Sequence, residues 1–156
     1  DSAPFPVVFV PRAAQRGVMF QKMDTTEPRI NGEWPDVLNK KLDELIVQEY
    51  WYAGKQEEQA NVVWLKINGA WLRLYFDSAI IFWRSSENEP SYSAPGPNES
   101  HNYPLRNLGA ELRVRDQTIV KCEPTVIVNG AQVTLSFGNG RKLTFKSVND
   151  STTIET

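Results

Sequence analysis

Histidine, cysteine and carboxylate side chains are the residues of this chain that could do chemistry. His101 is the only histidine and Cys122 the only cysteine, so neither a thiolate metal cluster nor an intrachain disulfide can form. Cys122 lies in the strand-like run TIVKCEP, where a buried, inert thiol is expected. His101 lies in a polar stretch without partners at metal-ligand spacing. We therefore predict no catalytic residues, no metal and no cofactor.

Scattered carboxylates leave one route to catalysis open. An acid–base enzyme would need two carboxyl groups brought together. The candidates are Glu57-Glu58, Asp77, Glu111, Asp116 and Glu123. Nothing in their spacing pairs any two of them, and charged side chains are mostly exposed to solvent. No Walker sequence and no Gly-x-Ser-x-Gly elbow occurs, so an enzyme is only the third hypothesis.

The most informative pattern is the alternation of aromatic and basic residues in WLKINGAWLRLYFDSAIIFWRSS, residues 64–86. Asn68-Gly69 tolerates the positive φ angles of a type I′ turn and, between two strand patterns, is the strongest short hairpin signal. Counting outward from this turn, one face carries only apolar pairs, namely Ile67–Ala70, Leu65–Leu72 and Val63–Leu74. The other face carries Lys66–Trp71, Trp64–Arg73 and Val62–Tyr75. The aliphatic face is expected to be core.

A second turn at Asp77-Ser78 would add a third strand to this ladder. Arg84 would then lie beside Trp71, and Phe82 beside Arg73, so that rings and cations alternate in both directions. The candidate binding residues are Trp64, Lys66, Trp71, Arg73, Tyr75, Phe82 and Arg84.

Three interpretations fit this set of side chains. Cross-strand aromatic and cation–π pairs stabilise a sheet face by about 0.5–1 kcal/mol each, so the ladder can be purely structural. Trp, Tyr and Arg are also enriched at interface hot spots, which favours a docking face for a protein partner. If the sheet closes into a barrel, the same face would line a cavity for a small amphipathic or aromatic anion, such as a fatty acid.

The elements that must position the ladder are mainly hairpins. Asn129-Gly130 predicts a second Asn-Gly hairpin. A three-residue loop over Gly138–Gly140 sets Leu135 opposite Leu143, whereas a two-residue turn would mix apolar with polar residues, so the longer loop is predicted. The run ELRVRDQTIVKCE predicts a further hairpin about Asp116-Gln117.

One helix is expected before these hairpins. In WPDVLNKKLDELIVQEY, apolar residues recur at helical spacing. They are Leu38, Leu42, Leu45 and Ile46. Pro35 and Asp36 suit a first helical turn. We predict one amphipathic helix over Pro35–Glu49 that lies on a sheet, preceded by strands in PFPVVFVPR and RGVMFQKM.

Together these elements predict a single, mainly β (α+β) domain over residues 1–156. It would hold about nine or ten short antiparallel strands and the one helix, arranged as an antiparallel β-barrel or a strongly curved sheet. Residues 84–104 are rich in Ser, Pro, Asn and Glu without periodicity, which predicts a long, flexible loop.

Two short stretches resemble lipocalins. The last hairpin, VTLSFGNGRKLTFKS, is similar to the closing hairpin of small lipocalin-like barrels. Gly32-Glu33-Trp34 matches the Gly-x-Trp with which lipocalins open. The resemblance implies a ligand-carrying barrel. Because Pro35 and the predicted helix follow where lipocalins run into a strand, we do not assign the family.

Charge and hydropathy limit the partners. The net charge of −2 lacks the basic footprint of a nucleic-acid binder, and no apolar run approaches the length of a membrane span. A cleaved signal peptide would explain the start at Asp1-Ser2 and would make the protein secreted or periplasmic, but an excised domain would explain it equally. The compartment therefore stays open.

The leading hypothesis is a non-catalytic binding protein, of inhibitor or immunity type, that docks a protein partner through the aromatic and basic face. One alternative is a lipocalin-like barrel that carries a small amphipathic or aromatic anion. Another is a structural domain of a larger protein.

Overall fold

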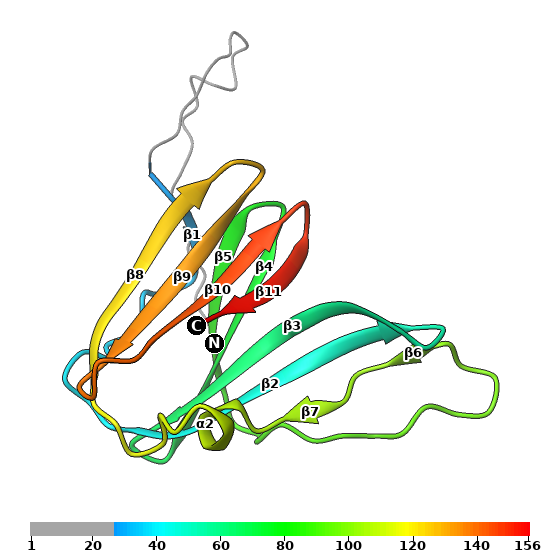
Figure 1. Ribbon diagram of the computed structural model, residues 1–156, viewed down its shortest axis with the longest axis horizontal. Coiled ribbons are helices and arrows are strands. Elements are labelled where there is room, and N and C mark those ends of the chain that lie inside the picture. The colour runs from blue at the N-terminus through cyan, green and yellow to red at the C-terminus, as the bar shows by residue number, and fades with distance from the viewer. Residues whose placement is uncertain (1–26) are drawn as a thin grey trace, which may run out of the picture.

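The computed structural model describes residues 27–156, which form two β-sheets (Figure 1). The larger sheet has the order β1-β5-β4-β3-β2-β6, and β7 also pairs with β2. Its strands are β1 (Arg29–Asn31), β2 (Leu42–Tyr52), β3 (Lys55–Ile67), β4 (Ala70–Asp77), β5 (Ile80–Ser86), β6 (His101–Asn102) and β7 (Leu105–Arg106). The smaller sheet has the order β11-β10-β9-β8. Its strands are β8 (Ile119–Ile127), β9 (Gly130–Phe137), β10 (Lys142–Val148) and β11 (Ser151–Glu155).

The mainly β, antiparallel prediction is confirmed, with one parallel pair, β1 with β5. Residues 27–156 form no closed barrel. One reason lies in the edge strand β8, in which Pro124 follows the exposed charged residues Lys121 and Glu123. Proline cannot donate to a further strand, and charges discourage edge pairing, so this edge is protected without closure.

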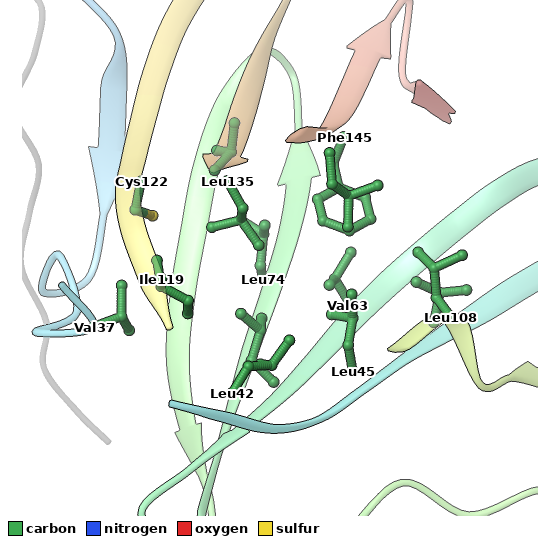
Figure 2. Packing of buried hydrophobic residues seen from close by; sticks show 14 of the residues in the cluster. Val37, Leu42, Leu45, Val63, Leu74, Leu108, Ile119, Cys122, Leu135 and Phe145 are labelled. Atoms are coloured by element: carbon green, nitrogen blue, oxygen red, sulfur yellow. The ribbon is translucent and has the colours of Figure 1, made fainter. Parts of the chain in front are cut away.

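The core lies between the two sheets (Figure 2). Val63 and Leu74 of the larger sheet pack in one cluster with Leu135 and Phe145 of the smaller sheet, and all four side chains are fully buried. Burying a side chain such as Phe145 stabilises the fold by roughly 1.5–3 kcal/mol. Of the aliphatic face of the Asn68-Gly69 hairpin, predicted to be core, Val63, Leu65, Ile67 and Leu74 are buried, whereas Leu72 is half-buried and Ala70 next to the turn is exposed.

The helix predicted over Pro35–Glu49 is wrong, because most of that segment belongs to strand β2. The pairing of β2 with β3 shifts register between Leu42 and Glu44. A bulge of this kind inserts an extra residue, so the buried Leu42 and Leu45 stand three residues apart, as on a helix. Beyond the bulge, Leu45 and Val47 are both buried and follow the period of two that is typical of a strand.

Two predicted turns are confirmed. Asn68-Gly69 connects β3 to β4 in the expected register, with Lys66 opposite Trp71. Gly138–Gly140 forms the three-residue loop between β9 and β10, which sets Leu135 opposite Leu143. Gly140 has a φ of +91°, the left-handed conformation expected of a bulge residue at this position.

Two other turns lie one residue away from their predicted positions. The β4–β5 turn is Ser78-Ala79, because Asp77 pairs with Ile80. The β8–β9 turn is Val128-Asn129, because Ile127 pairs with Gly130. Gly130 is therefore required for packing and not for the turn: a Cβ there would lie 1.7 Å from the Ser147 carbonyl oxygen.

The hairpin predicted about Asp116-Gln117 is wrong. The chain there follows α2 (Leu108–Glu111), the one helix in residues 27–156. The backbone of Asp116 and Gln117 bonds to Leu42 in β2, at N···O distances of 2.7 and 2.9 Å. Val114 is buried outside any strand, and Ile119 begins β8. Long-range bonds to β2 thus replace the local pairing.

The loop predicted over residues 84–104 overlaps two strands, because Arg84–Ser86 belong to β5 and His101–Asn102 form β6. Residues 87–100 contain no helix or strand, and the chain then returns along β2 as β6 and β7. The flexibility of this connection stays a prediction. The strands predicted in PFPVVFVPR and RGVMFQKM lie outside the described residues.

Candidate binding surfaces

The seven candidate residues lie on one face of the larger sheet, across β3, β4 and β5. We call this set, Trp64, Lys66, Trp71, Arg73, Tyr75, Phe82 and Arg84, the aromatic/basic face. Side chains alternate between the two faces of a strand. Since Val63, Leu65 and Leu74 point into the core, the aromatic/basic face points away from the smaller sheet. Its members are half-buried, except Trp71, which is 7% exposed.

The β3–β4 part of this face has the predicted alternation of rings and cations. Arg73 Cζ lies 5.8 Å from the centroid of the Trp64 ring, and Lys66 Nζ lies 5.6 Å from that of Trp71. The Trp64 and Trp71 rings meet edge to face, with centroids 6.3 Å apart. Each cation therefore covers the ring on the opposite strand, within the range of a cation–π interaction.

The predicted position of β5 in this ladder is wrong by two residues. Arg84 lies opposite Arg73 and not opposite Trp71, and Phe82 lies opposite Tyr75 and not opposite Arg73. The cause is the Ser78-Ala79 turn. A shift of two positions keeps every side chain on its face, so Tyr75 and Phe82 stack with centroids 5.0 Å apart.

The three cations of the face differ in their partners. Arg84 donates from Nη1 to the carbonyl oxygens of Asn31 and Trp83, at 3.1 and 2.8 Å, and from Nη2 to Asn31 Oδ1. Arg84 therefore ties β1 to β5. Lys66 lies 3.8 Å from a carboxylate oxygen of Glu44. Arg73 forms no ion pair with any residue of the described part.

The Trp64–Arg73 pair contains two buried donors without acceptors. Trp64 Nε1 and Arg73 Nε are inaccessible to solvent and have no hydrogen-bond partner among the described residues. Leaving a buried donor unsatisfied costs about 1–3 kcal/mol. Buried polar groups are nearly always satisfied in native proteins, so each exception requires an explanation such as a function. Two exceptions in one cross-strand pair mark this pair as the centre of the candidate surface.

A separate groove lies at the Asn68 end of the larger sheet, on its core side. Its volume is about 590 Å³, and it lies between the β1–β2 connection and strands β3, β4 and β5. Lining residues include Trp34, Lys40, Ile67, Leu72, Trp83 and Ser85. The rings of Trp34 and Trp83 meet edge to face with centroids 5.4 Å apart. Sequence reasoning singled out Trp34 only as part of a Gly-x-Trp match and did not bring it to Trp83.

A cluster of tyrosines with the only histidine was also missed. Tyr50 stacks on Tyr103 and on His101, with centroids 5.1 and 5.7 Å apart, and its hydroxyl lies 2.8 Å from His101 Nδ1. Tyr52 packs against His101 at 5.1 Å. The pairing of β2 with β6 creates this cluster. The only sequence signal was Tyr50 and Tyr52 on one side of a strand that had been taken for a helix.

Three of the groups considered for nucleophilic or acid–base chemistry, Cys122, Glu111 and Glu58, are buried or bonded within the fold. Burial raises the pKa of the Cys122 thiol to about 12, so it is neutral at physiological pH. Glu111 accepts two bonds from Arg106 Nε, at 3.0 and 3.1 Å. Glu58 accepts from the backbone N–H of Thr152 at 3.2 Å, and burial raises the pKa of its carboxyl group.

A metal-ligand cluster, a membrane-spanning helix or similarity to known proteins would each be a further sign of function. In residues 27–156, no three His, Cys, Asp or Glu side chains converge in a group that could hold a metal ion. No helix in the same range has the length and apolarity to cross a bilayer. Comparison with protein-family models, curated proteins and solved structures finds no match for this chain.

Proposed function

We propose that this chain is a non-catalytic binding protein that docks a protein partner through the aromatic/basic face. The observation that carries the proposal is the Trp64–Arg73 pair on the adjacent strands β3 and β4. It holds two buried N–H donors that have no acceptor within residues 27–156. Tryptophan and arginine are the residues most enriched at interface hot spots. An inhibitor- or immunity-type role is the narrower form of this proposal and requires that the partner be an enzyme.

The chemistry of the face indicates what the partner presents. Arg73 has no carboxylate partner among the described residues, and Arg84 lies directly opposite it. Two guanidinium groups on neighbouring strands attract carboxylates, and a guanidinium binds a carboxylate through two parallel hydrogen bonds. We therefore expect an acidic segment of the partner, with Asp or Glu side chains at its centre.

Docking would require Arg73 to move. Its guanidinium now covers the Trp64 ring, and the Nε of Arg73 and the Nε1 of Trp64 are both shielded from solvent. When Arg73 turns toward a carboxylate of the partner, both donors become accessible to acceptors at the interface. Arg73 thus acts as a cover of the Trp64 ring in the free protein and as the carboxylate-binding group in the complex.

The test is a comparison of captured proteins between matched variants. Arg73→Met and Trp64→Leu alter the face, whereas Arg141→Met removes an exposed cation from the β9–β10 loop. The proposal expects a protein from the natural source that binds the wild type and Arg141→Met at fixed stoichiometry. Arg73→Met should weaken the purified complex by a factor of about 30 or more, the scale of a hot-spot residue. Equal binding by all three variants would refute the proposal.

The two alternatives, a barrel that carries a small ligand and a purely structural ladder, each require a different property of the fold. A barrel carrier would need a closed barrel around the aromatic/basic face, and residues 27–156 form two separate sheets. A purely structural ladder would require the face to stabilise the fold. The structural interpretation predicts that Arg73→Met loses much stability. The unsatisfied Nε of Arg73 predicts the opposite, because the substitution removes a buried donor that has no acceptor within residues 27–156.

A further inference from the structure

We propose that the groove between Trp34 and Trp83 is a second binding site and that its ligand is a small aromatic carboxylic acid. This proposal does not rest on the Trp64–Arg73 pair. The groove is lined mainly by the β1–β2 connection and by core-side residues such as Ile67 and Leu72, and Arg84 is the one residue that it shares with the aromatic/basic face. The groove volume of about 590 Å³ lies within the roughly 300–1,000 Å³ that small-molecule sites occupy.

The local sequence creates the groove through Gly32. This residue has a φ of +100°, and a Cβ on it would lie 2.3 Å from the Trp83 carbonyl oxygen. Only glycine permits so close an approach of the connection to β5. The approach brings Trp34, two residues later, against Trp83. On β5, the small, exposed Ser85 lies opposite Leu72 of β4. Its short side chain leaves space over Leu72.

The walls favour a flat aromatic group. The planes of Trp34 and Trp83 stand at 77° to each other, so they form two sides of a corner. Trp83 is 3% exposed, whereas Trp34 is half-buried, so a planar ligand ring would stack on Trp34 with its edge toward Trp83, the two arrangements that aromatic pairs prefer. Leu72 and Ile67 complete an apolar lining.

The polar groups favour a ligand that accepts hydrogen bonds. Trp83 is 3% exposed, and its Nε1 has no acceptor among the described residues. This Nε1 is inaccessible to solvent, so a ligand bonds to it only after the Trp83 side chain shifts. Because an indole N–H can only donate, the group that it then meets is an oxygen acceptor and not an ammonium group. A carboxylate is the strongest such acceptor.

Lys40 supplies the countercharge. Its ammonium group pairs with Asp36 at 3.2 Å, but the Asp36 side chain is 86% exposed. Such a surface pair contributes little and is easily exchanged, so Lys40 can turn to a ligand carboxylate. Glu33, Asp36 and Arg84 also line the groove. Together with Lys40 they give two carboxylates and two cations, a balance that disfavours a polyanion such as a phosphate ester. A monocarboxylate fits this balance.

The test is calorimetric titration of the full chain with 2-naphthoate, 2-naphthamide and decanoate. We expect saturable binding of 2-naphthoate in the sub-millimolar range. The neutral amide and the aliphatic acid should each bind about tenfold more weakly or not at all, as expected when a charge-assisted bond or the ring stacking is lost.

Variants locate the site. Trp83→Phe keeps the ring and removes the N–H, and Lys40→Gln removes the charge; each should weaken 2-naphthoate by about tenfold or more. Leu72→Trp should block the groove. Arg141→Met, in the exposed β9–β10 loop away from the groove, should bind as the wild type does. Absence of saturation up to about 5 mM, equal affinity for the amide, or binding unchanged in Lys40→Gln and Leu72→Trp would overturn the proposal. These outcomes leave the docking proposal untouched, because its variants alter other residues.

Discussion

Replacing Arg73 with methionine is expected to preserve or increase the stability of this fold, although Arg73 lies on β4, one of the two central strands in the order of the larger sheet. The substitution keeps an unbranched apolar stem over the Trp64 ring and removes the guanidinium group. Its effect can be worked out from three features of the structure: the cation–π contact, the unsatisfied Nε and the charge of Arg84 on the opposite strand.

One of these terms favours arginine, and two oppose it. The contact at 5.8 Å from the Trp64 centroid stabilises the fold by about 0.5–1 kcal/mol. The buried Nε without an acceptor costs about 1–3 kcal/mol. Arg84, directly opposite, adds a repulsion between like charges, which is also destabilising. Because the opposing terms are larger, Arg73→Met should raise the free energy of unfolding by about 0–2 kcal/mol.

The assay is urea unfolding of the wild type, Arg73→Met, Trp64→Leu and the double variant at neutral pH. The double-mutant cycle should give a coupling energy of about 0.5–1 kcal/mol between Trp64 and Arg73. Arg141→Met, in an exposed loop, serves as the control and should lie within about 0.5 kcal/mol of the wild type. A loss above about 1 kcal/mol in Arg73→Met, or a coupling above about 2 kcal/mol, would refute the reasoning and make the face structural.

Three further predictions concern the rest of the fold. Because burial raises the pKa of the Cys122 thiol to about 12, a thiol reagent at mildly alkaline pH should react slowly with the folded protein and completely in urea; a fast native reaction would contradict this. Gly130→Ala should destabilise by about 3 kcal/mol, because its Cβ would lie 1.7 Å from the Ser147 carbonyl oxygen; urea unfolding that shows less than about 1 kcal/mol would exclude the close approach. Burial raises the pKa of Glu58 above its ordinary value of 4.5, so the folded state binds this proton more tightly than the unfolded state does. Stability therefore falls as the pH rises from 4.5 through the folded-state pKa. Glu58→Gln should remove this decline while still accepting from Thr152; an unchanged slope in unfolding experiments across that range would show that another group causes it.

Features that depend on neighbouring residues were predictable from the sequence. The Asn68-Gly69 hairpin and the Gly138–Gly140 loop were placed correctly because turn chemistry and the period of two act within a few residues. The Ser78-Ala79 turn was missed because neither residue favours positive φ, yet both adopt it, at +53° and +65°. Pairing of β4 with β5 outweighs that local preference.

The wrong helix has a similar cause. A bulge in β2 places Leu42 and Leu45 at helical spacing, and the sequence pattern alone does not distinguish the two structures. Only the long pairing with β3 shows that the segment is a strand. Pattern reasoning is least secure where an extra residue breaks the period of a strand.

Of the two candidate surfaces, part of the aromatic/basic face was predictable from the sequence, whereas the groove was not. Rows of the aromatic/basic face within the β3–β4 hairpin were predictable, since Trp64 and Arg73 are placed by one turn. The groove was not predictable, because it depends on the parallel pairing of β1 with β5. Parallel strands are joined by long connections that carry no short turn signal, so nothing in the sequence links Trp34 to Trp83.

By itself, the sequence determined a mainly β chain, the faces of its central hairpin and the aliphatic side that forms the core. These properties follow from turn residues and alternation, which act over a few positions. Tertiary structure alone decided that two sheets pack without closing, that Trp83 approaches Trp34, and that Tyr50 meets His101. Such contacts arise when distant segments share a buried surface, and their free energy depends on the packing of the whole core.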